Sequence, residues 1–179
     1  RKIQQELDLQ NDKSMIGRPF GGSNCKSHPK TKRPFSSKHQ IHLILKSSRA
    51  TGAHSMLHPR SVDHVNRLVR KFAVANGVHL QNFVNVGNHL HLLVKCRQRH
   101  QLVRYLKIIS GLIPRLILGC QRGSPLAPAE RFWDARPFTK IMASGRRTFQ
   151  IIRRYFDKNR WQAVHRVERL DFLPLHETG

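Results

Sequence analysis

Residues 78–95, which read V-H-L-Q-N-F-V-N-V-G-N-H-L-H-L-L-V-K, decide the fold of this chain. Two β-rich runs, 78–86 and 89–95, flank the dipeptide Gly87-Asn88, a pattern typical of two antiparallel strands joined by a two-residue turn. Successive side chains of a strand point to opposite faces, so His89 and His91 project from the same face. The stretch predicts a β-hairpin that presents two imidazoles on one side.

Hydrophobic spacing on both sides of this β-hairpin predicts the remaining elements. Strands are expected over 40–46 and 137–142, and helices over 62–75, 98–118 and 146–161. Phe149, Ile152 and Phe156 form the expected buried stripe of the last helix. The predicted fold is α+β, with the ferredoxin-like βαββαβ order of an antiparallel sheet and an additional C-terminal helix that carries Tyr155. The predicted helices cover one face of the sheet, and the other face is left open for a substrate beside the two histidines.

Length and charge narrow the class of protein. The chain has 179 residues, with 33 Lys plus Arg against 10 Asp plus Glu, for a net charge of +23. This excess indicates a polyanionic partner, most simply nucleic acid. The absence of a long apolar run argues against a membrane protein. Three separated cysteines without a CxxC pair argue against a zinc ribbon and favour a reducing cytoplasm.

Composition divides the chain into three parts. Residues 1–38 are rich in Gly, Pro and Lys and are expected to form a weakly ordered basic extension. This extension is either a solvated tail or an arm that becomes ordered on nucleic acid through cations such as Lys32, Arg33 and Lys38. Residues 39–165 are the expected folded domain, and residues 166–179 the C-terminal tail.

Several polar residues could form a site, and each has a simpler interpretation. The pair His89 and His91 could bind one metal ion or could be polar residues of a half-buried strand. His42, on the first strand, could line the same site but is more simply a solvated histidine. Tyr155 and Asn159 share one helical face at i,i+4 spacing. The tyrosine is either a surface aromatic or a nucleophile in a cluster that suits a scissile phosphate, formed by Arg153, Arg154, Lys158 and Arg160.

Three segments resemble one family of enzymes. His89-Leu90-His91 looks like the His-hydrophobic-His motif of the HUH endonucleases, and residues 83–94 resemble the IS200-like single-tyrosine transposases. Residues 33–39 and 131–134 are similar to the REP-associated branch of that family. The loop 131–134, Arg-Phe-Trp-Asp, is otherwise expected to be anchored by burial of its aromatic side chains, with base stacking as the alternative.

The resemblance implies a metal-dependent endonuclease and strand transferase that acts on single-stranded DNA beside DNA hairpins through a 5′-phosphotyrosine intermediate. It implies Tyr155 as the nucleophile, Mg²⁺ or Mn²⁺ bound by His89 and His91, and Asn159 as a third ligand. The implied protein is a monomer or a homodimer associated with the nucleoid. The alternative from the residues themselves is a non-catalytic nucleic-acid-binding protein that uses the same basic sheet face. A zinc hydrolase is a more distant alternative, since no further ligand stands at suitable spacing.

Overall fold

The computed structural model describes residues 15–22, 32–120 and 131–171. Its elements follow the predicted order, with one additional strand at the start. In chain order they are β1 (Met15–Phe20), β2 (Ile41–Lys46), the 3-10 turn η1 (Gly52–His54), α2 (Val62–Ala75), β3 (Val78–Asn85), β4 (His89–Cys96), α3 (Arg99–Ile117), β5 (Phe138–Met142) and α4 (Arg146–Asp171).

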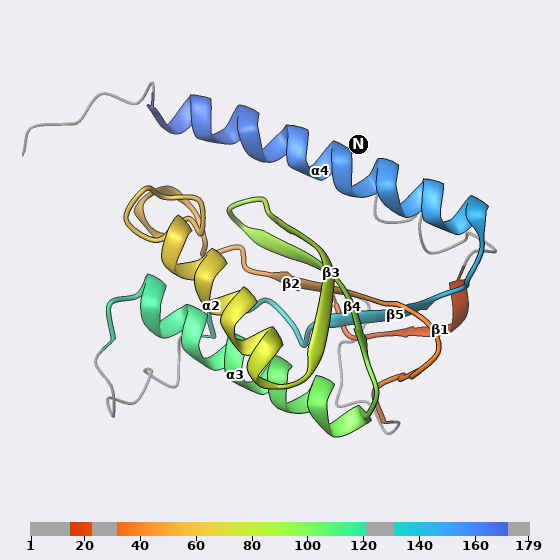
Figure 1. Cartoon of the computed structure of the whole chain (residues 1–179). Coiled ribbons are helices and arrows are strands. Elements are labelled where there is room, and N and C mark those ends of the chain that lie inside the picture. Colours follow the sequence, from red (N-terminus) through yellow and green to blue (C-terminus); the bar gives the residue numbers. More distant parts are fainter. Residues whose placement is uncertain (1–14, 23–31, 121–130, 172–179) are drawn as a thin grey trace, which may run out of the picture.

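The described strands form one sheet in the order β1-β5-β2-β4-β3, and every neighbouring pair is antiparallel (Figure 1). When β1 is left out and the remaining four strands are numbered along the chain, their order across the sheet is 4-1-3-2. This is the strand order of a ferredoxin-like sheet. The predicted α+β class and βαββαβ order are therefore confirmed.

The turn between β3 and β4 fixes the register of the histidine strand. Val86 donates its backbone N–H to the carbonyl of His89 at 2.9 Å, so Gly87 and Asn88 are the two turn residues. Gly87 has a φ of +93°, which side chains other than hydrogen strongly disfavour. A Cβ atom at this position would lie 2.9 Å from Ser55 Oγ, because the loop before α2 packs on the turn. This position therefore requires glycine.

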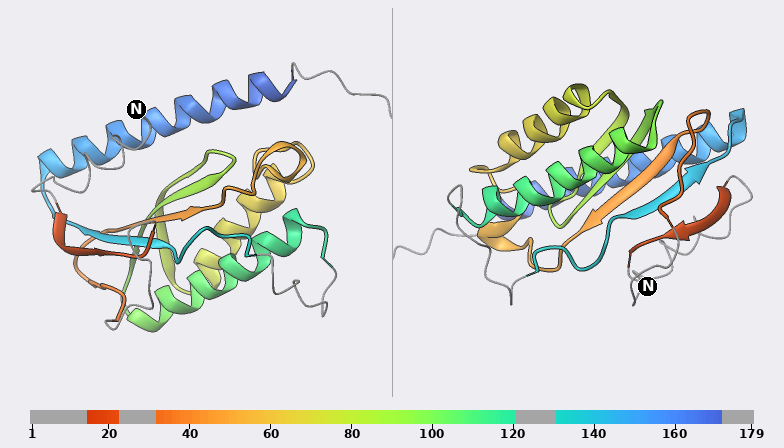
Figure 2. Two further views of the ribbon diagram at one scale, coloured as in Figure 1. Left: turned by 180° about the vertical axis from the view of Figure 1, so that it is seen from behind. Right: turned by 90° about the horizontal axis from the view of Figure 1, so that it is seen from below.

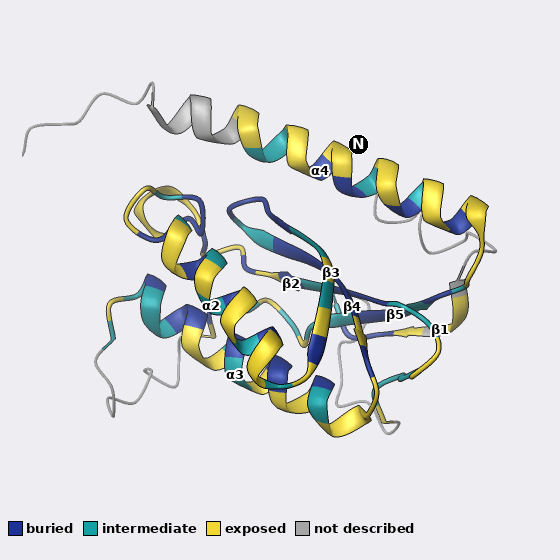
Figure 3. Cartoon of the chain, viewed as in Figure 1, coloured by how far each residue is buried: buried dark blue, intermediate teal, exposed yellow. Residues whose placement is uncertain are grey.

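Helices cover both faces of the sheet. The main core lies between the sheet and the pair α2 and α3, where Leu90, Leu92 and Val94 of β4 are buried. On the opposite face α4 lies across the sheet, and Ile152 and Phe156 pack on Val84 and Leu93 (Figures 1 and 2). Over residues 146–165, the buried positions of α4 face the sheet and its outer surface is exposed (Figure 3). The expectation of an open second face is wrong, since α4 covers part of it.

Two helix predictions also need correction. The last helix continues to Asp171 rather than ending near residue 161, because no Gly or Pro interrupts the sequence in between. Phe149, expected in the buried stripe of this helix, is 58% exposed. Phe149 lies in the first turn of the helix, where it lines a polar cavity together with Gln81 and Lys95 instead of packing on apolar side chains of the sheet.

The basic extension is more ordered than predicted where it is described. Residues 15–20 form β1 on β5, and Lys140 donates from Nζ to the Gly17 carbonyl at 2.5 Å. Arg33 donates to the Pro137 carbonyl at 2.7 Å and to the Thr139 hydroxyl, and its guanidinium lies 4.7 Å from the centre of the Phe20 ring. These contacts form only in the folded chain, so local composition did not reveal them. Residues 1–14 and 23–31 lie outside the described part.

The aromatic loop before β5 is anchored by burial, as predicted. Phe132 is buried, and Trp133 donates its indole N–H to the Ser110 carbonyl at 2.8 Å. Asp134 accepts hydrogen bonds from the backbone and the hydroxyl of Ser48 at 2.6 and 2.8 Å.

Within the described ranges no helix combines the length and the apolar character needed to cross a bilayer.

Candidate active site

Strand register brings three histidines together on the face covered by α4. His91 pairs with Ile44 and His89 with Lys46, while His42 lies two residues before Ile44 on β2. The two-residue period of a strand places His42, His89 and His91 on one face. The rings of His89 and His91 are 4.6 Å apart between centroids, and those of His42 and His91 are stacked at 5.9 Å. His42 is buried, so the expectation of a solvated histidine is wrong.

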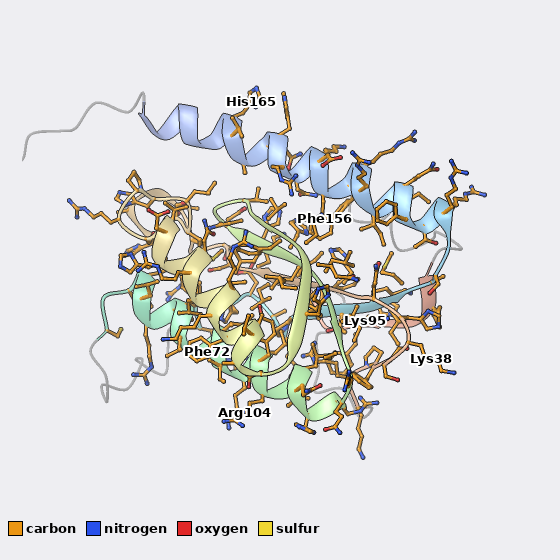
Figure 4. The ribbon with its side chains drawn as sticks, viewed as in Figure 1. Lys38, Phe72, Lys95, Arg104, Phe156 and His165 are labelled. Carbon is orange, nitrogen blue, oxygen red and sulfur yellow. The ribbon has the colours of Figure 1, made fainter. Side chains whose placement is uncertain are left out.

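Helix α4 brings Tyr155 onto this histidine cluster. Ile152 and Phe156 anchor the helix on the sheet, and Tyr155 lies on the adjacent flank of the helix, half-buried. Figure 4 shows Phe156 in the layer between α4 and the sheet. The Tyr155 hydroxyl lies 3.2 Å from Nδ1 of His91, and its ring meets the His42 and His91 rings edge-on. The only tyrosine of α4 thus has its hydroxyl oxygen beside the predicted His-x-His motif.

Burial holds the central imidazoles in their neutral form. It lowers the pKa of His42 to about 4 and that of His91 well below its usual range. The positive charges that His89 and His42 would carry lower the pKa of His91 further, whereas the Asn159 side chain opposes the decrease. His91 is only 2% exposed, and in the described structure its Nε2 is buried without a hydrogen-bond partner, as is Nε2 of His42. Neutral imidazole with a lone pair is the form that binds metal ions.

Asn159 and Asn88 orient the groups around the histidine pair. Asn159 is buried one turn after Tyr155, and its amide nitrogen donates to the Tyr155 carbonyl at 2.7 Å. Nδ1 of His89 lies 2.7 Å from the side-chain oxygen of Asn88, which places the proton on Nδ1 and the lone pair on Nε2. The predicted nucleophile and all three predicted ligands therefore converge on one site.

The side chains at this site could complete the coordination of a cation only together with ligands that the chain does not supply. Among the described residues no three His, Cys, Asp or Glu side chains are arranged to bind a metal. Two imidazoles and an amide oxygen would leave the remaining positions to water or phosphate oxygens, which is common for Mn²⁺ and Mg²⁺ in phosphoryl-transfer sites. The orphaned Nε2 of His91 is the atom that a bound cation would satisfy.

The predicted DNA-contacting cations of α4 divide between its two flanks. Lys158 lies three residues after Tyr155, and Arg154 lies four residues before Lys158. These two exposed cations therefore lie on the tyrosine side of the helix. Arg153 and Arg160 lie on the other flank, 3.9 and 3.7 Å from Asp157, and Arg160 also donates to Asn82 of β3 at 3.2 Å. Only the first pair is placed beside the site.

The three cations predicted in the extension lie away from Tyr155. Lys32 is exposed, whereas the contacts of Arg33 with Phe20, Pro137 and Thr139 are internal to the fold. Burial and the nearby Arg136 lower the pKa of Arg33 to about 10. Lys38 lines a cavity at the opposite end of β4 from His89.

Lys46 is a cation at the site that the sequence predictions missed. It is exposed, shares the sheet face of His42 by two-residue alternation, and pairs directly with His89. The alternation in His42-Leu43-Ile44-Leu45-Lys46 carried this signal, but only the pairing of β2 with β4 shows which residue it faces.

No protein-family model matches the chain, and no curated protein is significantly similar to it. Among solved structures, it is similar to the crystal structure of a protein from Deinococcus radiodurans R1 described as "a putative transposase". The TM-score is 0.42 and the sequence identity 18%, over 73% of this chain and 98% of that chain.

Proposed function

We propose that the protein is a transposase-like enzyme that cuts single-stranded DNA with Tyr155 as the nucleophile. The observation that carries the proposal is the 3.2 Å separation of the Tyr155 hydroxyl and Nδ1 of His91, at the centre of a cluster of three histidines. The resemblance of residues 83–94 to single-tyrosine transposases supports the same assignment from the sequence. The similarity of residues 33–39 and 131–134 to the REP-associated branch supports cleavage beside DNA hairpins.

We infer that His89, His91 and Asn159 hold a Mn²⁺ or Mg²⁺ ion. The fit rests on the buried, partnerless Nε2 of His91 and on the fixed tautomer of His89. When bound, such an ion would polarise the scissile phosphate and stabilise the negative charge that develops on its oxygens.

The proposed cleavage step uses Tyr155 as the attacking group. The Tyr155 oxygen forms a bond to phosphorus, and the bond from phosphorus to the 3′ oxygen breaks, which leaves a 5′-phosphotyrosine and a free 3′-OH. The tyrosine proton passes to water, and the 3′ oxygen takes a proton from water. With the His91 proton on Nδ1, this N–H donates to the tyrosine oxygen and stabilises its negative charge. A phenol with an ordinary pKa near 10 needs such assistance at neutral pH.

Positive charge around the site favours a polyanionic substrate. Arg154, Lys158 and Lys46 are exposed cations on the tyrosine side of α4 or on the sheet face beside His89. The net charge of +23 extends this preference to the whole molecule. A single strand suits the site better than a duplex, because α4 crosses the sheet and restricts access to His91, which is 2% exposed.

The proposal is tested by trapping the covalent intermediate. The full chain is incubated with Mn²⁺ and a pool of labelled single-stranded oligonucleotides that contain DNA hairpins, and adducts are resolved under denaturing conditions. We expect an adduct with the wild type and none with Tyr155→Phe. Tyr105→Phe is the matched control, because the chain has two tyrosines and Tyr105 is buried on α3 with its hydroxyl donating to Val69.

Two outcomes contradict the proposal in different ways. An adduct that survives Tyr155→Phe assigns the nucleophile to another residue. Salt-sensitive DNA binding with no adduct under any metal condition, unchanged by His89→Ala and His91→Ala, supports the non-catalytic binding protein. The burial of His91 beneath α4 is the observation that keeps this second function in view.

A further inference from the structure

A polar cavity lies at the other end of β4 from His89. Its volume is about 210 Å³, and it lies where the start of β2, the end of β4, β3 and the turn between β5 and α4 meet. The side chains that matter for its chemistry are Lys38, Gln40, Gln81, Lys95 and Phe149. Figure 4 labels Lys38 and Lys95 at this end of the sheet. Pockets for drug-sized ligands are larger, roughly 300–1,000 Å³, so this cavity suits a group the size of one base.

Hydrogen bonds connect the segments that form the walls of the cavity. Nδ1 of His39 lies 3.0 Å from the hydroxyl of Ser144, which ties the segment before β2 to the turn before α4. The backbone N–H of Met142 donates to the Gln40 carbonyl at 2.9 Å. On β3 the register shifts between Leu80 and Asn82, so Gln81 is the extra residue of a bulge, a feature that often redirects a side chain.

The lining has the chemistry of a nucleotide site. Lys38 and Lys95 supply two positive charges, and none of the residues that line the cavity is acidic. Gln40 and Gln81 supply amides that can both donate and accept hydrogen bonds at the edge of a base. Phe149 places a ring that is 58% exposed at the same cavity, where an unpaired base can stack on it.

We propose that this cavity binds one unpaired nucleotide, with its base stacked on Phe149 and its phosphate between Lys38 and Lys95. Phe149 and Tyr155 are six residues apart on α4, which places them about 9 Å apart along the axis and roughly 120° apart around it. The nucleotide therefore lies on the opposite flank of α4 from Tyr155, separate from the proposed cleavage site. That the nucleotide belongs to DNA rather than RNA rests on the proposed function.

Binding is measured on the Tyr155→Phe background, so that covalent capture does not contribute to the affinity. Fluorescence anisotropy compares a labelled oligothymidylate with an oligouridylate of the same length and with a DNA duplex. We expect Phe149→Leu to weaken single-strand binding roughly 5- to 100-fold, because the stacking ring is lost. Phe149→Tyr keeps the ring and retains the affinity. Val103→Ala, an exposed apolar residue of α3 on the other face of the sheet, is the control.

A photocrosslinking arm places the base directly. Oligothymidylate with 5-iodouracil at single positions is irradiated on the protein, and crosslinked peptides are identified by mass spectrometry. We expect crosslinks in the tryptic peptide 148–153, which contains Phe149.

Lys95→Gln should reduce the salt dependence of single-strand binding by about 0.7 in the slope of log K against log salt. Lys107→Gln, on exposed α3, should not.

The outcomes separate this inference from the proposed function. Unchanged affinity of Phe149→Leu, or crosslinks only in other peptides, overturns the nucleotide cavity even when Tyr155 forms an adduct. A crosslink at 148–153 and weaker binding by Phe149→Leu support the cavity even when no adduct forms. Equal loss of oligouridylate and oligothymidylate binding in Phe149→Leu supports the nucleotide cavity but overturns its restriction to DNA. Loss of oligouridylate binding alone overturns its assignment to DNA.

Discussion

At the residue scale, the burial of the histidine cluster makes the stability of the fold depend on pH. His42 and His91 are buried against aromatic rings, and the Nε2 atom of each is unpartnered. A buried imidazole resists protonation, so folding and acidity oppose each other at this site. A protein core without a function here would favour apolar side chains, which have no such penalty.

This burial predicts an acid-labile fold. The unfolded chain protonates His42 near pH 6.5, whereas the folded chain does not until the pH reaches about 4. The unfolded state therefore binds more protons between these values, and the free energy of unfolding falls as the pH drops from 6.5 to 4. The loss due to His42 reaches about 3 kcal/mol at the end of this window. Urea unfolding at neutral and acidic pH, with a chelator present, measures it.

Replacement of His42 by phenylalanine removes this contribution. His42→Phe should reduce the loss of stability between pH 6.5 and 4, because phenylalanine fits among Tyr155, Phe138 and Phe156 and does not titrate. Replacement of the exposed His79 by glutamine is the control and should leave the acid sensitivity unchanged. An acid response identical in His42→Phe and the wild type would contradict the role assigned to His42.

Individual residues show where sequence patterns were sufficient. The His-x-His spacing placed His89 and His91 on one face, and i,i+4 spacing placed Tyr155 beside Asn159 on one helical face. These are local periodicities. The burial of His42 and the proximity of Lys46 to His89 depend on the pairing of β2 with β4, which joins segments more than forty residues apart in sequence. Phe149 has helical spacing for the buried stripe but lines a polar cavity, a difference that helical spacing alone does not reveal.

At the scale of elements, the β3–β4 turn controls the position of the histidine strand. Gly87→Ala should destabilise the fold by about 1–3 kcal/mol, because alanine resists a φ of +93° and its Cβ would approach Ser55 Oγ to 2.9 Å. Gly111→Ala is a matched control in the exposed interior of α3, where a Cβ meets nothing within 4 Å. It should stabilise the fold by about 0.5–1 kcal/mol. Equal effects in urea unfolding would show that the turn tolerates a side chain.

Arg33 contributes to the stability of the edge strand β1. Arg33→Gln should lower stability by about 1–3 kcal/mol, because its contacts with Phe20, Pro137 and Thr139 are lost. Hydrogen exchange should accelerate in the amides of residues 15–20 and remain unchanged in β3. Lys32→Ala, an exposed neighbour, should leave both segments unchanged. Unaltered hydrogen exchange of β1 in Arg33→Gln would contradict this structural role and would favour a role of Arg33 in DNA binding.

An element can be predicted from the sequence when the residues that determine it lie within or next to that element. Helix α2 was predicted with its observed bounds, because its apolar stripe begins near Ser61 and its end is set by Gly77. Strand β1 was missed because Gly17 and Pro19 disrupt the pattern, and an edge strand tolerates such residues only when a neighbour pairs with it. Sequence periodicity describes a segment alone, whereas β1 exists through β5, Lys140 and Arg33.

At the scale of the whole molecule, the net charge of +23 leads us to expect that the affinity of the proposed single-strand binding falls steeply with salt. The combination of Arg154→Gln and Lys158→Gln should reduce the slope of log K against log salt for a single strand by about 1.4, if each residue neutralises one phosphate beside Tyr155. Arg104→Gln with Lys107→Gln removes the same charge from exposed positions of α3 and is the control. An equal reduction by both pairs of substitutions would mean that the nucleic acid responds to the net charge of the molecule and has no preferred position on the tyrosine flank of α4. A reduction confined to the α4 pair would place the strand's backbone at the proposed nucleophile, and it would do so even in the Tyr155→Phe protein, where no cleavage can contribute.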